Sequence, residues 1–244
     1  MRPFRLLPLW ILILPLLLAW RGEAKEITFR QLSVDRGLSQ STVTAMAQDP
    51  CGNLWLGTRD GLNRYDGYDF RAFHADASDS LSLADNAITV LRMAENGPLW
   101  IGTESGLSCY DFQAQRFKNF KGAHLSTTLC DIHVTEECLY LGTHEGVILF
   151  DPRRGEVVET LLAGIRVRVL CPTADGSALL LGTENGLYRY HLTRRETLRL
   201  AESTPSYDLS CIVPAPSGGY WISTHGNGLL RLDEEFRLRK HFLS

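Results

Sequence analysis

Five copies of one short motif recur along this chain and constrain its fold more than any other feature. In each copy a hydrophobic strand runs into a small residue and a threonine, then a polar dipeptide and a glycine, and a second apolar strand follows. The copies read LWLGTRDGLNRYD from Leu54, LWIGTESGLSCYD from Leu99, LYLGTHEGVILFD from Leu139, LLLGTENGLYRYH from Leu179 and YWISTHGNGLLRLD from Tyr220, the last with one extra residue. Their anchors are 45, 40, 40 and 41 residues apart: Gly57, Gly102, Gly142, Gly182 and Ser223. This period predicts an all-β fold, a β-propeller whose blades are four-stranded antiparallel sheets.

One repeat has room for four strands. In the first copy VTAMAQD from Val43 is a strand, a turn follows at 50–53, and LWLGT is the second strand. Gly61 and Gly67 mark two further reversals, because glycine supplies the positive φ that hairpin turns need. We therefore place the five blades at about 41–75, 86–121, 127–162, 166–201 and 207–244.

Aromatic and acidic residues recur at fixed slots of the repeat. The second strand carries Trp55, Trp100, Tyr140, Leu180 and Trp221 at one slot, and the third carries Tyr65, Tyr110, Phe150 and Tyr190 at another. Aromatic rings can stack on sugars, but recurrence in nearly every blade favours packing between blades. Aspartates follow the third strand, where this residue commonly bonds to the backbone: Asp66, Asp111, Asp151 and Asp233. We interpret them as turn formers rather than as catalytic carboxylates.

The first 24 residues differ from the repeats. Arg2 and Arg5 precede an apolar run at 6–20, and the small residues Gly22 and Ala24 flank a glutamate. This order is typical of a secretory signal peptide cleaved after Ala24. An uncleaved N-terminal anchor is the alternative, although the run is short for a membrane span. We expect a signal peptide at 1–24 and the propeller at 25–244.

The charge balance argues against nucleic acid as a partner. Without residues 1–24 the chain keeps 22 basic and 27 acidic residues, which gives a net charge of −5. Nucleic-acid binding needs a basic stripe. We therefore predict no nucleic-acid partner for this mildly acidic exported domain.

Six cysteines in an exported protein normally indicate disulfides. Cys130, Cys171 and Cys211, however, lie 12, 11 and 12 residues before their anchors, where the first two blades have Ala45 and Val90. A slot that accepts Ala, Val and Cys predicts a small, buried position on the innermost strand, so we favour free thiols. No cysteine has metal-ligand spacing with a histidine, and we predict no metal site and no cofactor.

The opening repeats resemble a known family. The residues that carry the resemblance are the DGL and NRYDG runs at 60–67 and the SL-x-x-N lead of Ser82, Leu83 and Asn86. Over residues 27 to about 240, and most strongly in the first two repeats, the chain resembles the two-component regulator propeller family. The resemblance implies the periplasmic sensor region of a hybrid histidine kinase of the Bacteroidetes type, where many such sensors respond to oligosaccharides.

In that family two propellers, a β-sandwich and a membrane helix precede the kinase. The sequence of this chain has no phosphoacceptor histidine helix, no Gly-rich ATP-binding boxes and no receiver-like βα alternation. We therefore expect that this chain by itself is not an enzyme.

The strand count predicts an incomplete ring. The resemblance implies that a strand at 26–34, which includes the alternating ITFRQL, closes the ring by joining the last blade. The fifth repeat already supplies its own later strands up to Ser244. Two more repeats would complete a seven-bladed ring, so we expect the N-terminal part of a longer, truncated sensor. A closed five-bladed propeller is the alternative.

The polar dipeptide between the second and third strands is the variable part of the motif. In a propeller it emerges on the same face as the connections between blades. Variation among constant neighbours indicates ligand recognition, although any single member could be a solvated turn residue. The predicted ligand-binding residues, around one mouth of the central channel, are Arg59, Asp60, Glu104, His144, Glu145, Glu184, Asn185, His225 and Asn227. The Asp-rich loop from His74 to Ala87 is expected to overhang this face.

Three function classes remain. The first is the sensory module of a two-component system, with an oligosaccharide ligand, further propeller, sandwich and kinase modules as partners, and a homodimer in that context. The second is a free-standing secreted propeller that binds glycan or protein. The third is a propeller lyase or glycosidase, which would need acid and base groups such as Glu145 and His144 near one mouth. The repeat explains those side chains without catalysis, so we predict no catalytic residue.

Overall fold

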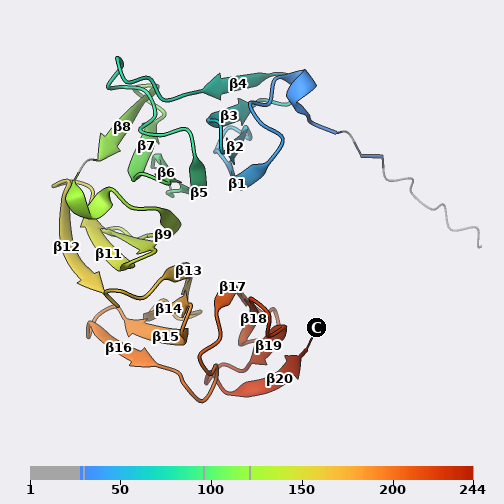
Figure 1. Cartoon of the computed structure of the whole chain (residues 1–244), viewed down its shortest axis with the longest axis vertical. Helices are drawn as coiled ribbons and strands as arrows, with labels where there is room; N and C mark the ends of the chain where they lie inside the picture. Colours follow the sequence, from blue (N-terminus) through green and yellow to red (C-terminus); the bar gives the residue numbers. More distant parts are fainter. Residues whose placement is uncertain (1–27, 30, 96, 121, 244) are drawn as a thin grey trace, which may run out of the picture. The chain divides into compact units, whose positions relative to one another are not determined.

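The computed structural model describes residues 28, 29, 31–95, 97–120 and 122–243. Contacts divide the chain into two units, Met1–Leu32 and Ser33–Ser244. The second unit contains five sheets, each with four strands in chain order and antiparallel neighbours, which we call blades 1 to 5 (Figure 1). The prediction of an all-β fold made of four-stranded antiparallel blades is confirmed.

In each blade the first strand is innermost and the fourth outermost (Figure 1). Blade 1 comprises β1 (Val43–Gln48), β2 (Leu54–Thr58), β3 (Leu62–Tyr65) and β4 (Phe70–Phe73). Blade 2 comprises β5 (Ile88–Met93), β6 (Leu99–Thr103), β7 (Leu107–Asp111) and β8 (Arg116–Phe120). Blade 3 comprises β9 (Leu129–Val134), β10 (Leu139–Thr143), β11 (Gly146–Asp151) and β12 (Glu156–Leu161). Blade 4 comprises β13 (Val167–Pro172), β14 (Ala178–Thr183), β15 (Gly186–His191) and β16 (Glu196–Arg199). Blade 5 comprises β17 (Leu209–Pro214), β18 (Tyr220–Thr224), β19 (Leu229–Leu232) and β20 (Leu238–Phe242).

Two short 3₁₀ helices precede blades 1 and 3: η1 (Val34–Arg36) and η2 (Ala123–Leu125). The expected signal peptide at 1–24 lies outside the described residues. The expected ring-closing strand at 26–34 lies partly outside them, and none of its described residues is in a strand. Its role stays a prediction.

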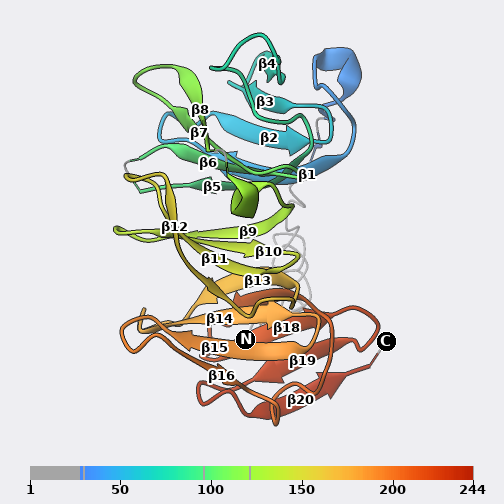
Figure 2. The same cartoon turned by 60° about the vertical axis from the view of Figure 1, so that its left-hand side comes forward.

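Adjacent blades contact each other through their innermost strands. β1 contacts β5, β5 contacts β9, β9 contacts β13, and β13 contacts β17. Figures 1 and 2 both show blade 1 and blade 5 at opposite ends of this row. The described part of Ser33–Ser244 therefore does not form the closed five-bladed ring that was the alternative.

Four hydrophobic clusters lie between the five blades, one for each adjacent pair. Successive residues of a strand point to opposite faces of its sheet. In blade 2, Leu99 accordingly packs toward blade 1, whereas Trp100 packs toward blade 3. The fully buried ring of Trp55 lies 4.9 Å from that of Tyr110 in blade 2, measured between centroids. The prediction that the recurring aromatic residues pack between blades is confirmed where a second blade covers them. Tyr65 and Trp221, on the outward faces of blades 1 and 5, are half-buried and contact rings of their own blades.

The outward faces of blades 1 and 5 carry the same apolar slots without a covering blade. Leu54 is 37% exposed, whereas its counterparts in the other blades are at most 5% exposed: Leu99, Leu139, Leu179 and Tyr220. Leu229 is 38% exposed, whereas its counterparts are 0% exposed: Leu62, Leu107, Val147 and Leu187. Each repeat is thus built to be covered on both faces, as expected for a stack of repeats.

The anchor glycine of the motif allows the next blade to approach closely. A Cβ atom added at Gly102 would lie 2.4 Å from Cγ1 of Val90 and 3.0 Å from Cβ of Leu129 in blade 3. In blade 5, Ser223 takes the anchor position, and its hydroxyl group lies 2.8 Å from that of Ser210. No later blade among the described residues crowds this side chain.

We expect Gly102→Ala to lower the free energy of unfolding by about 1–3 kcal/mol, because the added methyl group overpacks the space beside Val90 and Leu129. Backbone entropy alone would favour alanine in a strand, so a loss of stability isolates the steric effect. Urea denaturation measures the change. Ser223→Ala is the matched control and should cost about 1 kcal/mol or less, since it loses one hydrogen bond. Equal losses in the two variants would contradict the packing explanation.

The prediction that three cysteines share one buried slot is wrong. The residues opposite the five anchors are Ala45, Val90, Asp131, Val169 and Cys211. The hairpin between the first and second strands differs in length among blades, so a fixed count back from the anchor reaches different positions. Cys130 precedes the slot by one residue and Cys171 follows it by two.

The cysteines also differ in burial. Cys109 and Cys171 are buried, Cys130 and Cys138 are half-buried, and Cys51 and Cys211 are exposed. All six are free thiols, as the sequence favoured. Burial raises the pKa of Cys109, Cys130 and Cys171 to about 11, which keeps these thiols protonated and unreactive at neutral pH.

The aspartates after the third strand form turns, as predicted. Oδ1 of Asp66 accepts the backbone N–H groups of Tyr68 and Asp69, each at 2.9 Å. Asp111, Asp151 and Asp233 accept backbone N–H groups in the same turn of their own blades. Blade 4 has His191 at this position, and its Nδ1 accepts the N–H of Arg194 at 3.3 Å.

Asp131 joins the innermost strands of three blades. Its Oδ1 accepts hydrogen bonds from Nη2 of Arg92 in blade 2 and from the N–H of Ile132, both at 2.8 Å. Its Oδ2 accepts the N–H of Leu170 in blade 4 at 2.9 Å. The residue is only 5% exposed, so this carboxylate is a structural link rather than a solvated side chain.

Candidate functional site

The hairpin between the second and third strands is held by the threonine of the motif. In blade 1, Oγ1 of Thr58 donates to the carbonyl of Gly61 at 2.9 Å and accepts the N–H of Asp60 at 3.0 Å. The same pair of bonds occurs at Thr103, Thr143, Thr183 and Thr224. The polar dipeptide needs no side-chain bond of its own to form the turn, so its side chains are free for other contacts.

These hairpins and the connections between blades lie on one side of the blades, which we call the loop face. Backbone bonds join them: the N–H of Glu104 to the carbonyl of Ala87 at 3.0 Å, and the N–H of His225 to the carbonyl of Asp208 at 2.8 Å. The opposite side, which we call the turn face, carries the other hairpins of each blade.

The candidate residues are mostly open to solvent. Seven of them are exposed, namely Arg59, Asp60, Glu104, His144, Glu145, Asn185 and His225, and two are half-buried, namely Glu184 and Asn227. Some of their backbone groups are occupied, because Arg199 donates to the carbonyl of Asn185 at 3.1 Å and Nε2 of His241 lies 2.6 Å from the carbonyl oxygen of Asn227.

The middle of the loop face is the part where candidate side chains influence one another. Partial burial and the cations of Arg166 and Arg168 lower the pKa of His144, against the opposing effect of Glu184 and Glu104. The imidazole is therefore mainly neutral at pH 7, and it can both donate and accept a hydrogen bond. The two carboxylates that raise this pKa, those of Glu104 and Glu184, come from the neighbouring blades 2 and 4.

One pair of charges beside this region is already satisfied. Nε and Nη2 of Arg168 donate to the two carboxylate oxygens of Asp208 at 2.8 and 2.9 Å. This bidentate bond raises the pKa of Arg168 and joins blades 4 and 5. Neither side chain is free to bind a ligand without breaking it.

The structure does not gather all nine candidates around one mouth. Arg59 and Asp60 lie on blade 1, and His225 and Asn227 lie on blade 5, at the other end of the row (Figures 1 and 2). The nine candidates therefore form a row of polar side chains along the loop face, which we call the file. The predicted ring around a channel would need further blades.

The sequence predicted that the loop from His74 to Ala87 overhangs the loop face. For the middle of the loop this prediction is wrong. Its middle is bonded to the outer strand β8, where Leu81 accepts the N–H of Phe117 at 3.2 Å and Ser82 accepts from Asn119 at 2.9 Å. Leu83 is buried under blade 2. Its C-terminal end does reach the loop-face hairpins: Asn86 accepts the N–H of Gly61 at 2.8 Å, Ala87 accepts that of Glu104 at 3.0 Å, and Asp85 accepts the hydroxyl of Ser105.

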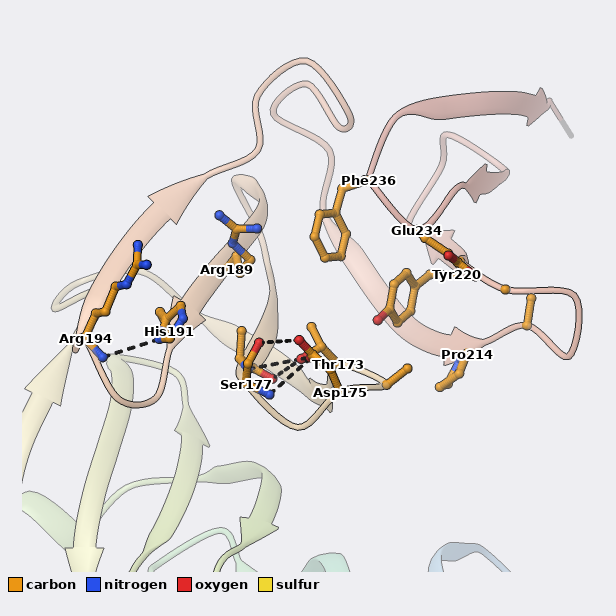
Figure 3. A pocket seen from close by; sticks show the side chains of 15 residues that line it. Thr173, Asp175, Ser177, Arg189, His191, Arg194, Pro214, Tyr220, Glu234 and Phe236 are labelled. Carbon is orange, nitrogen blue, oxygen red and sulfur yellow. Dashed lines mark hydrogen bonds between the residues drawn. The ribbon is translucent and has the colours of Figure 1, made fainter.

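A pocket on the turn face was not predicted from the sequence. The pocket has a volume of about 550 Å³ and lies between blades 4 and 5 (Figure 3). Its lining includes Arg189 and His191 of β15, Arg194 of the following turn, and Tyr220 and Phe236 of blade 5. The one signal for it in the sequence is His191, which stands where the other four blades have aspartate.

Neither a metal cluster nor a membrane helix is found in the described part of the chain. Its residues include no group of three or more histidine, cysteine, aspartate or glutamate side chains placed to hold a metal ion. No helix within the same residues has the length and apolar character required to cross a membrane.

Comparison with known proteins supports the resemblance seen in the sequence. Residues 37–60 match the family model described as Two component regulator propeller. The chain is 38% identical over 69 residues to Histidine kinase P4 of Formosa agariphila, a match that covers 28% of this chain and 5% of that protein. The predicted resemblance is confirmed, and this chain spans only a small part of the kinase it matches.

Solved structures share the fold. The extracellular domain of a hybrid two component system from B. thetaiotaomicron has a TM-score of 0.74 at 22% identity, over 86% of this chain and 31% of that one. Virginiamycin B lyase from Staphylococcus aureus has a TM-score of 0.65 at 12% identity, over 82% of this chain and 69% of that one. An extracellular domain of a two component system and a lyase thus share this fold, so the fold alone does not separate binding from catalysis.

Proposed function

We propose that this chain is the ligand-binding part of an extracytoplasmic sensor in a two-component signal transduction system. The two-component regulator propeller repeat at residues 37–60 carries the proposal. The identity with a histidine kinase over 69 residues supports it. The proposed role is recognition without catalysis, in the periplasm, with residues 1–24 as the export signal.

The proposed sensor is longer than this chain. Leu54 and Leu229 are exposed at slots that every other blade buries. Two further blades would cover both faces, complete a seven-bladed ring, and take residues 26–34 as the closing strand. The proposed partners are these blades, a sandwich and a kinase module beyond them, and a second copy of the whole sensor.

The proposed ligand is an oligosaccharide that lies along the loop face. The candidate dipeptides there offer carboxylate, imidazole and amide groups, which suit hydroxyl groups as donors and acceptors. His144 and Glu145 are at the centre of the file, on blade 3, and both are exposed. They are the side chains whose loss should matter most.

Calorimetric titration of the purified chain with a panel of oligosaccharides tests this function. We expect saturable binding of at least one oligosaccharide and a loss of tenfold or more in the double variant His144→Ala, Glu145→Gln. The fold should survive, because Thr143 and Gly146 hold the hairpin. Glu156→Gln, at an exposed position of β12, is the control and should bind normally.

Two results would overturn the proposal. One is the absence of oligosaccharide binding, or binding that the double variant leaves unchanged. The other is the appearance of cleaved or unsaturated products during incubation, since product formation would show a propeller lyase or glycosidase.

A further inference from the structure

The pocket between blades 4 and 5 on the turn face has one basic wall. Arg189, His191 and Arg194 line it from blade 4 (Figure 3). The guanidinium of Arg189 lies over the ring of Phe236, 5.6 Å from its centroid. Among the described residues, neither arginine has a carboxylate within salt-bridge distance. Both can therefore receive an anionic group.

His191 makes this wall basic by departing from the repeat. At the same turn, Asp66, Asp111, Asp151 and Asp233 cap the backbone with a negative charge. His191 caps it through Nδ1 instead. Its proton is then on Nε2, which is a donor. The substitution keeps the turn and removes a carboxylate from beside Arg189.

The carboxylate of Asp175, which also lines the pocket, already accepts three hydrogen bonds. Asp175 accepts the hydroxyl of Thr173 at 2.6 Å and the hydroxyl and N–H of Ser177 at 2.7 and 3.1 Å. These bonds lower the pKa of Asp175 to about 2. Its oxygens are turned to the hairpin that it shapes, so it does not pair with the basic wall.

The opposite wall has a different chemistry. Tyr220 and Phe236 stack with ring centroids 5.6 Å apart, and both are largely buried. Burial raises the pKa of Tyr220, so its phenol stays protonated. Glu234 also lines the pocket and lies on the blade 5 side, beyond Tyr220 (Figure 3). A carboxylate and a phenol on this side can accept hydrogen bonds from hydroxyl groups, and the carboxylate repels a second anion.

We propose that this pocket binds a sugar acid, with its carboxylate on Arg189, His191 and Arg194 and its hydroxyl groups toward Glu234 and Tyr220. Guanidinium groups bind carboxylates in a two-pronged geometry. The volume of about 550 Å³ is within the range of small-molecule sites. The pocket is separate from the loop face, so this site does not depend on the function proposed there.

Calorimetric titration of the chain with D-glucuronate tests the proposal, with D-glucose as the uncharged counterpart. We expect saturable glucuronate binding that is at least tenfold tighter than glucose binding. His191→Asp should weaken it tenfold or more, because it places the residue of the other four blades at this turn and returns a negative charge to the wall. Arg189→Met should have a similar effect.

Arg64→Met is the matched control. Arg64 has the same position in β3 that Arg189 has in β15, opposite Trp55 and Leu180 respectively, and it does not line this pocket. Normal binding in this variant, together with the losses above, supports the site. Glucuronate binding that His191→Asp and Arg189→Met leave unchanged would overturn it, as would equal binding of glucose and glucuronate, or no binding at all. The variant His144→Ala, Glu145→Gln should lose oligosaccharide binding at the loop face but keep normal glucuronate binding in this pocket.

Discussion

Trp55→Ala should lower the free energy of unfolding by about 3–5 kcal/mol. The indole is 0% exposed and packs on Phe73, Tyr110 and Phe112, which belong to blades 1 and 2. Its Nε1 donates to Oδ2 of Asp49 at 3.0 Å. The variant therefore leaves a cavity between two blades and deprives a largely buried carboxylate of one donor. Urea denaturation, followed by circular dichroism, measures the loss.

Trp221→Ala is the matched control, because Trp221 has the same slot in the repeat. Its indole is only half-buried, and its aromatic neighbour is Phe242 of its own blade. We expect a cost of about 1 kcal/mol, at the low end for point variants. Equal costs at Trp55 and Trp221 would contradict the conclusion that coverage by the next blade is the source of the stability. In the longer sensor proposed above, the cost at Trp221 should rise toward that at Trp55.

Asp131→Ala should lower the free energy of unfolding by about 2–4 kcal/mol. The variant removes the acceptor of three hydrogen bonds and leaves the N–H of Leu170 without its partner inside the protein. Because these bonds join blades 2, 3 and 4, we also expect faster amide exchange in β9 and β13. Equilibrium denaturation and hydrogen exchange measure the two effects.

Arg92→Met separates the ion pair from the link to blade 4. The Arg92 side chain is 50% exposed, so solvent screens its charge and the loss should be about 1 kcal/mol or less. Asp131→Ala should therefore be clearly the more harmful variant. If the two variants lower the free energy of unfolding by the same amount, the hydrogen bond from the N–H of Leu170 to Asp131 does not stabilise the protein.

The blades could be predicted from the sequence because their determinants are local to one repeat. The Gly-Thr step, the aromatic slot and the aspartate turn each act within about 40 residues, so their period reveals the sheets directly. The position of Cys171 shows the limit. The hairpin between the first and second strands varies in length among blades, so a fixed distance from the anchor glycine does not identify the residue that pairs with it. A difference of one or two residues moves a side chain to another position in the strand pairing.

The candidate sites depend on relations between repeats, which a repeat pattern does not contain. Exposure of His144 and Glu145 follows from the hairpin alone and was predictable. Whether Arg59 meets His225 depends on closure of a ring, which no single repeat encodes. The turn-face pocket combines Arg189 with Phe236, 47 residues later in the chain. Its one signal in the sequence is His191, which replaces the aspartate of the other blades.

The hydrogen bonds of Thr143 to its own hairpin have a consequence for evolution. Since threonine and glycine hold the turn, exchanges at the two residues between them should leave folding stability nearly unchanged, as is usual for exposed positions. Each of the five hairpins can therefore diversify separately, without compensating changes in the cores between blades. Such proteins could acquire new ligands through substitutions at a few exposed residues while every blade continued to fold as before.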